Sequence, residues 1–231
     1  MNPLKLSITK IDVLSAIDKA LKEKFIDNLR NRSKIVQLDS RIRGYLGEIT
    51  LKRWFSDNGI IFSETNYINE TGDMDIDFIL KKDVNEWHIE VKTSLIPDSW
   101  GDLKSCIEKG DIKIIKRTEL IEDLKGDFHI QIYFNKKTNE RDNWLNGQKI
   151  NWQNKTPTEL YDLMNLNEYE EYFVSWIDRP SLILDIKDKI KNKKIATWKF
   201  GLREFWRCRI SLIGKDPCKL IETLKELKNE K

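Results

Sequence analysis

Two segments in the middle of the chain alternate charged and apolar residues, and they read GDMDIDFIL and WHIEVKT. Successive side chains of a β-strand point to opposite faces, so Asp75 and Asp77 share one face of the first segment. Glu90 and Lys92 share one face of the second segment in the same way. The polar stretch between the segments is short enough for a hairpin, and pairing the two strands would bring three acids and a lysine to one surface.

Such a group of side chains has a specific chemical use. Carboxylates that lie within a few ångströms repel one another unless a cation lies between them. Mg²⁺ prefers oxygen ligands and retains several waters, and it can bind a phosphate and activate a water for attack on it. A neighbouring lysine supplies a compact positive charge that can orient the water or stabilise charge that develops during the reaction. The pattern therefore predicts metal-dependent hydrolysis of a phosphodiester.

Asp77, followed 13 positions later (90 − 77) by Glu90-x-Lys92, resembles the motif of the PD-(D/E)XK nuclease superfamily. That superfamily includes restriction endonucleases, Holliday-junction resolvases and repair nucleases. The resemblance implies that Asp77 and Glu90 bind Mg²⁺, for which Mn²⁺ can substitute. It also implies that the carbonyl of Val91 is a further metal ligand and that Lys92 positions or activates the attacking water.

A glutamate upstream fits the same resemblance, because family members often carry one on the helix before the first core strand. Glu48 stands inside a predicted helix, and the resemblance implies that it helps to bind a second ion or orients a water. The choice between Asp75 and Asp77 as the principal metal ligand stays open, although the spacing favours Asp77. Ile76 occupies the position where many members have proline.

Hydrophobic periodicity predicts the elements around these segments. The helices that we expect span residues 8–29, 40–58, 119–125, 158–166, 182–190 and 217–228. The strands that we expect span residues 60–63, 74–82, 86–93, 111–116, 128–135, 172–177, 195–200 and 205–212. Asp39 or Ser40 can cap the start of the second helix, and Gly59 stands where a left-handed residue is wanted after its end. Residues 136–157 are rich in Asn and Lys and predict a long loop.

This order of elements predicts an α/β fold with a restriction-endonuclease-like core, in which helices flank a central mixed β-sheet. We expect an N-terminal helical segment over residues 1–38 and a nuclease core over residues 39–135. Residues 136–231 would complete the domain and could supply elements that recognise DNA.

The most basic part of the chain lies near its C-terminal end. Residues 187–209 contain nine basic residues and two acids, with Trp198 and three phenylalanine or tryptophan residues interleaved. Such a mixture can hold phosphates and stack on bases, although a hairpin with outward lysines and a buried aromatic face explains it equally well. The candidate nucleic-acid-binding residues are Lys193, Lys194, Trp198, Lys199, Arg203, Arg207 and Arg209.

Composition narrows the class of protein. The 231 residues include 41 basic and 38 acidic side chains, so net charge alone does not predict a nucleic-acid-binding protein. Neither a transmembrane run nor a secretory signal is recognisable, and three scattered cysteines favour a reducing cytoplasm over a disulfide framework. With His88 and His129 as the two histidines, a histidine-based metal site has few candidates.

The sequence thus predicts a Mg²⁺-dependent endonuclease that cuts double-stranded DNA in the manner of a type II restriction enzyme. Enzymes that cut both strands commonly act as dimers, so a homodimer is expected. One alternative is a structure-selective nuclease, such as a Holliday-junction resolvase or a repair or phage nuclease. The other is a DNA-binding protein that keeps the nuclease fold without catalysis.

Overall fold

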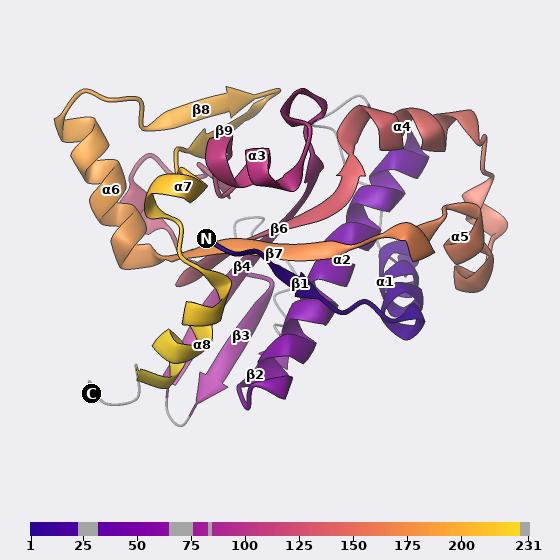
Figure 1. Cartoon of the computed structure of the whole chain (residues 1–231), viewed down its shortest axis with the longest axis horizontal. Coiled ribbons are helices and arrows are strands. Elements are labelled where there is room, and N and C mark those ends of the chain that lie inside the picture. The colour runs from indigo at the N-terminus through magenta and orange to yellow at the C-terminus, as the bar shows by residue number, and fades with distance from the viewer. Residues whose placement is uncertain (23–31, 65–75, 83–84, 227–231) are drawn as a thin grey trace.

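A computed structural model gives the fold, and it describes residues 1–22, 32–64, 76–82 and 85–226 (Figure 1). The main sheet contains β1 (Leu4–Leu6), β2 (Ile61–Glu64), β3 (Phe78–Lys82), β4 (Asn85–Ile96), β6 (Phe128–Lys137) and β7 (Glu171–Asp178). A smaller sheet contains β5 (Ile114–Ile115), β8 (Thr197–Phe200) and β9 (Arg203–Trp206). The α-helices are α1 (Lys10–Lys22), α2 (Lys34–Asp57), α3 (Leu103–Lys109), α4 (Thr138–Gly147), α5 (Pro157–Leu163), α6 (Arg179–Lys191), α7 (Ile210–Ile213) and α8 (Pro217–Glu226). Single 3₁₀ turns are η1 (Asp98–Trp100), η2 (Ile121–Asp123), η3 (Trp152–Asn154) and η4 (Leu166–Glu168).

The main sheet is mixed and has the strand order β1-β7-β6-β4-β3-β2. β2, β3 and β4 form an antiparallel meander, and β6 then pairs with β4 in parallel. The parallel pair requires a crossover connection, and α3 lies within it. The predicted α/β architecture with a mixed sheet between helices is therefore confirmed.

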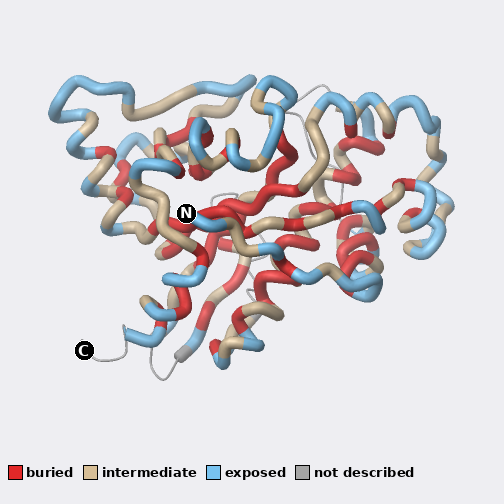
Figure 2. Tube along the Cα trace, viewed as in Figure 1, coloured by how far each residue is buried: buried red, intermediate tan, exposed pale blue. Residues whose placement is uncertain are grey.

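Two hydrophobic clusters cover the two faces of this sheet. The larger one joins the sheet to α1, α2 and α8, and it includes Ile89 and Val91 of β4. The smaller one joins the opposite face to α3, α6, α7 and the small sheet, and it includes Tyr133 of β6 and Trp206 of β9. Figure 2 shows buried residues concentrated in the central strands and along α2, while the turn between α6 and β8 is exposed.

Helix α2 starts earlier than its sequence predicts. The hydroxyl of Ser33 accepts a hydrogen bond from the amide of Val36 and caps the start of the helix. The expected start at Ser40 is therefore wrong. Asp39 is fully buried within the helix rather than capping it, and it contacts Arg43 and Arg141. Gly59, with φ of +75°, follows the end of the helix as predicted.

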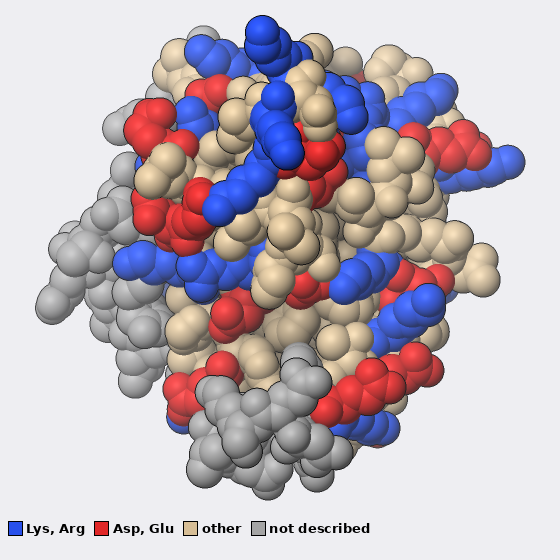
Figure 3. All heavy atoms as spheres, turned by 90° about the vertical axis from the view of Figure 1, so that its left-hand side faces the viewer, with Lys and Arg blue, Asp and Glu red and all other residues tan. Residues whose placement is uncertain are grey.

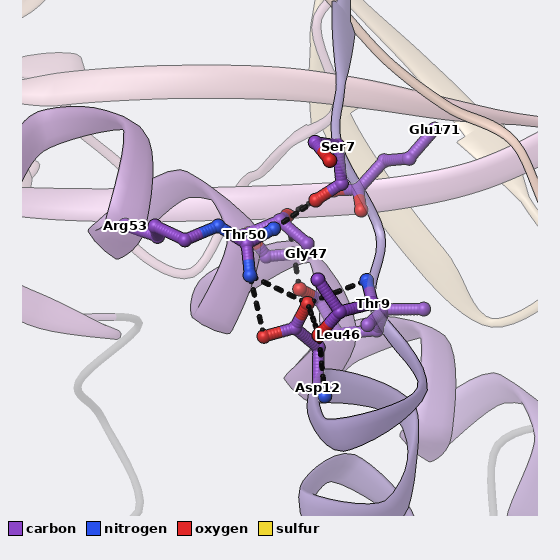
Figure 4. Close-up of polar contacts among 8 residues, drawn as sticks. All are labelled: Ser7, Thr9, Asp12, Leu46, Gly47, Thr50, Arg53 and Glu171. Atoms are coloured by element: carbon purple, nitrogen blue, oxygen red, sulfur yellow. Dashed lines mark hydrogen bonds and ion pairs between the residues drawn. The ribbon is translucent and has the colours of Figure 1, made fainter. Parts of the chain in front are cut away.

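Polar contacts bind α2 to its neighbours (Figure 4). Arg53 of α2 pairs with Asp12 of α1 at 2.6 Å and donates to the carbonyl of Ser7. One turn earlier, the hydroxyl of Thr50 donates to the buried carboxyl group of Glu171 at 2.8 Å. These contacts fix the long helix to α1 and to β7, and through β7 to the sheet.

The backbone of α2 approaches the side chain of Thr93 on β4 closely at Gly47. A Cβ atom built on Gly47 would lie 2.5 Å from Cγ2 of Thr93, which is too close for any real side chain. The absence of a side chain at this position lets the helix lie directly on the sheet. Gly47 therefore sets the spacing between α2 and the strand that carries Glu90 and Lys92.

Other predicted elements differ from the observed ones. The loop expected over residues 136–157 is wrong, because α4 occupies its first half. Asparagine disfavours helix, but burial of Arg141 and Leu145 stabilises this one. The strand expected over 111–116 is limited to β5, the helix over 119–125 to η2, and the strand over 205–212 ends at Trp206 before α7.

The domain division predicted from the sequence runs through continuous structure. Helix α2 crosses the boundary between residues 38 and 39, and β1 from the N-terminal segment pairs with β7. Within the described ranges, none of the helices combines the length and the apolarity that crossing a membrane requires.

Candidate active site

The predicted hairpin is present and brings the charged segments together. Phe78 lies opposite Ile89, and the antiparallel register continues along β3 and β4. Phe78, Ile89 and Val91 are buried against α2, as alternation predicted. Glu90 and Lys92 therefore point to the other face, and Asp75 lies outside the described residues.

Asp77 lies at the point where β3 begins to pair with β4. Its amide donates a hydrogen bond to the carbonyl of Ile89 at 2.9 Å, and its carboxylate accepts a hydrogen bond from the amide of Val91 at 2.5 Å. The side chain thus takes the place that a further residue of β3 would occupy along β4. This arrangement holds the Asp77 carboxylate beside the backbone of the Glu90-x-Lys92 segment.

The direction of the Val91 carbonyl follows from the same hydrogen bonds. The carbonyl of His88 accepts a hydrogen bond from the amide of Asp127, and the carbonyl of Lys92 accepts one from the side chain of Gln131. The backbone amides and carbonyls of even-numbered residues of β4 therefore point toward β6. The amide and carbonyl of one strand residue point to the same side, so those of Val91 face β3. Because the Val91 amide meets Asp77, its carbonyl lies on the same edge of β4 as that carboxylate.

Glu90 is held by two neighbours on its face of the sheet. Its Oε1 lies 2.9 Å from the ammonium of Lys92, and its Oε2 lies 2.6 Å from Nδ1 of His129. The side chain of Glu90 is only 4% exposed, whereas that of Lys92 is 23% exposed. Lys92 therefore reaches the surface, and the carboxylate beneath it is covered.

His129 is a site residue that the sequence prediction missed. It lies directly beside Glu90 because β6 pairs with β4 in parallel. An ionised carboxylate only accepts hydrogen bonds, so Nδ1 is the donor in this contact when Glu90 is ionised. Nε2 is buried without a hydrogen-bond partner among the residues that the structure describes. Gly126 packs against this ring, since a Cβ there would lie 2.9 Å from it.

Two further polar residues near the site differ in their roles. The amide of Gln131 donates to the carbonyl of Lys92 at 3.0 Å and to Ser94 Oγ at 3.2 Å, so this buried side chain fixes the β4 backbone. His88 instead lies 3.6 Å from the carboxylate of Asp127 and is half-buried. Gln131 thus contacts the backbone of Lys92 directly, whereas His88 is engaged by Asp127.

Glu48 lies on α2, which packs against the face of the sheet opposite to Glu90 and Lys92. Its carboxylate is 3.9 Å from the ammonium of Lys52, which lies 5.1 Å from the ring centre of Phe78. Glu48 is therefore connected to the start of β3, where Asp77 lies, through Lys52 and Phe78.

The donor set suits a hard divalent cation. Asp77 and Glu90 supply carboxylates, and Val91 supplies a carbonyl on the same edge of β4 as Asp77. Mg²⁺ is commonly held by one or two carboxylates together with waters and substrate phosphates, so these donors fit it. The described residues contain no group of three His, Cys, Asp or Glu side chains close enough to hold a metal.

A cleft of about 1010 Å³ opens beside Lys92. Its walls come from the first half of α2, the second half of β4, the segment around β5 and the β8–β9 hairpin. Three acids line it, Asp98, Asp111 and Asp142, against ten basic residues. The basic residues are Arg32, Arg41, Arg43, Lys92, Lys109, Lys113, Arg117, Arg203, Arg207 and Arg209. The cleft therefore has the charge to attract a polyanion.

The candidate nucleic-acid-binding residues near the C-terminal end divide into two groups. Trp198, Arg203, Arg207 and Arg209 line the cleft together with Lys92. Lys199, Lys193 and Lys194 are exposed elsewhere, and Lys194 lies 3.7 Å from Asp188. Figure 3 shows lysines and arginines interspersed with acids over the side of the molecule that carries α6, most densely in its upper part.

The chain was also compared with known proteins. No protein-family model, no curated protein and no solved structure shows significant similarity to it.

Proposed function

We propose that this chain is a Mg²⁺-dependent endonuclease that hydrolyses phosphodiester bonds of DNA, with a core organised like that of the PD-(D/E)XK superfamily. The observation that carries the proposal is the contact of the Asp77 carboxylate with the Glu90-x-Lys92 segment, at the amide of Val91. The succession of α2, the β2–β4 meander, α3 and the parallel strand β6 supports the proposed core.

Each residue has a role that its contacts support. Asp77, Glu90 and the Val91 carbonyl would hold the ion, whereas Glu48, on the helix that packs against the opposite face of the sheet, pairs with Lys52 at 3.9 Å and is left out of the proposed ligand set. Magnesium would supply positive charge that polarises the phosphodiester. The ammonium of Lys92, at the wall of the basic cleft, would orient the attacking water and stabilise negative charge that develops on the phosphate. Glu90 would hold that ammonium in place through their 2.9 Å contact.

Cleavage of supercoiled plasmid tests this proposal. We expect nicked or linear DNA with Mg²⁺ or Mn²⁺, and intact DNA with chelator. Lys92→Ala should lower the rate by about 100-fold or more, because it removes a charge that acts on the transition state. Lys81→Ala is the matched control, since Lys81 is an exposed lysine of β3 that pairs with Glu86. A Lys92→Ala protein that cuts as fast as the parent would reject the assigned role.

The form of the products separates the two nuclease classes. We favour a type II restriction enzyme, because the chain contributes a long region outside the proposed core, and part of that region, the β8–β9 hairpin, lines the basic cleft. Discrete fragments from plasmid and genomic DNA, with defined ends on sequencing, are expected. Cleavage confined to branched or damaged DNA would favour a junction or repair nuclease instead.

A restriction enzyme that cuts both strands would act as a homodimer in the cytoplasm. Sedimentation of the purified protein, alone and with duplex DNA in Ca²⁺, measures this directly. A monomer in both conditions would contradict the dimer. Nicking of one strand of the duplex would then be the favoured activity.

A further inference from the structure

The β8–β9 hairpin presents two chemically different faces. Trp206 of β9 is buried in the smaller hydrophobic cluster, which fixes one face of the hairpin to the body of the protein. The cross-strand pairs Trp198–Phe205 and Phe200–Arg203 belong to the other face, and all four residues line the basic cleft. The hairpin is thus anchored on one side and turned toward the cleft on the other.

The tip of this hairpin is apolar and exposed. A two-residue connection, Gly201-Leu202, joins the strands, and Gly201 has φ of +60°. The side chains on either side of this glycine are large, yet Phe200 is 54% exposed and Leu202 is 80% exposed. Large apolar side chains that lie exposed together commonly mark a binding surface.

The charges around the tip identify the kind of partner. Arg203 and Arg207 accompany Phe200 on the cleft face, and Lys92 and Arg41 line the same cleft. An apolar protein or lipid surface would not require so many positive charges beside it, whereas a polyanion with apolar rings inside its charged backbone matches both features. Double-stranded DNA has this composition, because stacked bases lie between two phosphate strands.

We propose that the β8–β9 hairpin is a wedge that inserts Phe200 and Leu202 between adjacent base pairs of the bound duplex. This inference rests on the proposed function and adds how the substrate is deformed. Trp198 and Phe205 stack with ring centres 4.7 Å apart and planes inclined by 19°, which gives the tip a stiff base. Separating a base step costs stacking free energy, and new apolar and phosphate contacts offset this cost.

The wedge has a consequence for substrate choice. Pyrimidine–purine steps unstack most easily, so the protein should prefer DNA in which such a step can reach the hairpin. Because Lys92 lines the same cleft, the deformed step and the phosphodiester to be cut would lie in one binding site.

Relaxation of closed circular plasmid by a metal-independent topoisomerase, in chelator, tests the wedge without cleavage. Partial insertion between base pairs untwists DNA, so the plasmid should retain negative supercoils after the protein is removed. The variant Phe200→Ala/Leu202→Ala should lose this effect and bind a short random-sequence duplex about tenfold more weakly, which corresponds to about 1.4 kcal/mol. Leu184→Ala is the matched control, since Leu184 is 70% exposed on α6 and does not line the cleft.

The outcomes distinguish the wedge from the nuclease proposal. A double variant that untwists plasmid as well as the parent overturns the wedge, while Mg²⁺-dependent cleavage would still stand. A parent that binds no duplex rejects both. If the double variant loses self-association in sedimentation but still untwists DNA, the tip binds a second copy of the chain and the wedge is wrong. Equal melting temperatures would show that all variants are folded.

Discussion

The imidazole of His129 holds the carboxylate of Glu90, because Nδ1 of the histidine lies 2.6 Å from Oε2 and both side chains are buried. The two residues lie side by side on parallel strands, so the contact is fixed by the sheet itself. With Oε2 engaged by His129 and Oε1 by Lys92, the carboxylate has little rotational freedom. His129 is therefore a positioning residue for the proposed metal ligand.

Replacing His129 tests this role. We expect His129→Ala to raise the Mg²⁺ concentration needed for half-maximal cleavage by about 10- to 100-fold, as loss of an outer partner of a metal ligand commonly does. His129→Asn should recover much of the loss, since its amide can donate to Glu90 from a similar position. The measurement is a Mg²⁺ titration of plasmid cleavage for both variants. A purely structural role would lower stability in His129→Ala and leave the titration midpoint where it was.

Asp77 combines a structural contact with a proposed catalytic charge, and the two can be separated. Its carboxylate accepts the Val91 amide at 2.5 Å, and the amide oxygen of asparagine can accept the same hydrogen bond. Asp77→Asn should therefore melt close to the parent but lose cleavage, because a neutral amide is a poor ligand for Mg²⁺. Asp77→Ala should lose cleavage and also be less stable by about 1 kcal/mol. Thermal melting and plasmid cleavage measure the two effects, and an active Asp77→Asn protein would contradict the proposed ligand.

The local part of this site could be predicted from the sequence. Strand alternation determines which face Glu90 and Lys92 share, and the short connection determines that β3 pairs with β4. Burial of Ile89 and Val91 on the opposite face confirms that interpretation. The detail that Asp77 caps the edge of β4 with its side chain was not predictable, since it depends on where β3 stops pairing.

The contacts that reach across the chain could not be predicted. His129 becomes a neighbour of Glu90 only through the parallel register of β4 and β6, which alternation within one strand does not define. Asp39 resembled a helix cap because it precedes an apolar run. Its partner Arg141 lies in a segment whose composition indicated a loop, so the buried ion pair was not evident.

The buried charges around Asp39 lead to a prediction about stability. Burial works to raise the pKa of Asp39, but the guanidinium groups of Arg43 and Arg141 outweigh it and hold that pKa below its ordinary value. Arg43 Nε lies 2.9 Å from the carboxylate, Arg141 Nη2 lies 2.8 Å from it, and Tyr169 donates to it at 2.6 Å. Asp39→Asn leaves two buried cations without their counter-charge, so the free energy of unfolding should fall by about 3–5 kcal/mol.

Urea unfolding at neutral pH measures this change. Asp18→Asn is a suitable control, because Asp18 pairs with Lys22 in an exposed position on α1 and should contribute less than about 1 kcal/mol. Equal losses in the two variants would show that the Asp39 network does not stabilise the junction of α2 and α4.

Glu171 predicts how stability depends on pH. Burial raises the pKa of Glu171 to about 8, although the hydrogen bond from Thr50 works in the opposite direction. In the unfolded chain a glutamate loses its proton near pH 4.3. Between these values the folded protein retains a proton that the unfolded chain has lost, so the stability that this group contributes falls as pH rises and levels off above about pH 8.

The variant Glu171→Gln carries no such proton, and it keeps an oxygen that can accept the hydrogen bond from Thr50. The variant should match the parent within about 1 kcal/mol at pH 5 and exceed it by on the order of a few kcal/mol at pH 9. Urea unfolding across this range measures the difference, with Glu170→Gln as the control, because exposed Glu170 has a pKa lowered by its hydrogen bond from Lys5 and is ionised throughout the range. If parent and Glu171→Gln lose stability in parallel from pH 5 to pH 9, the carboxyl group between α2 and β7 is not the one that titrates.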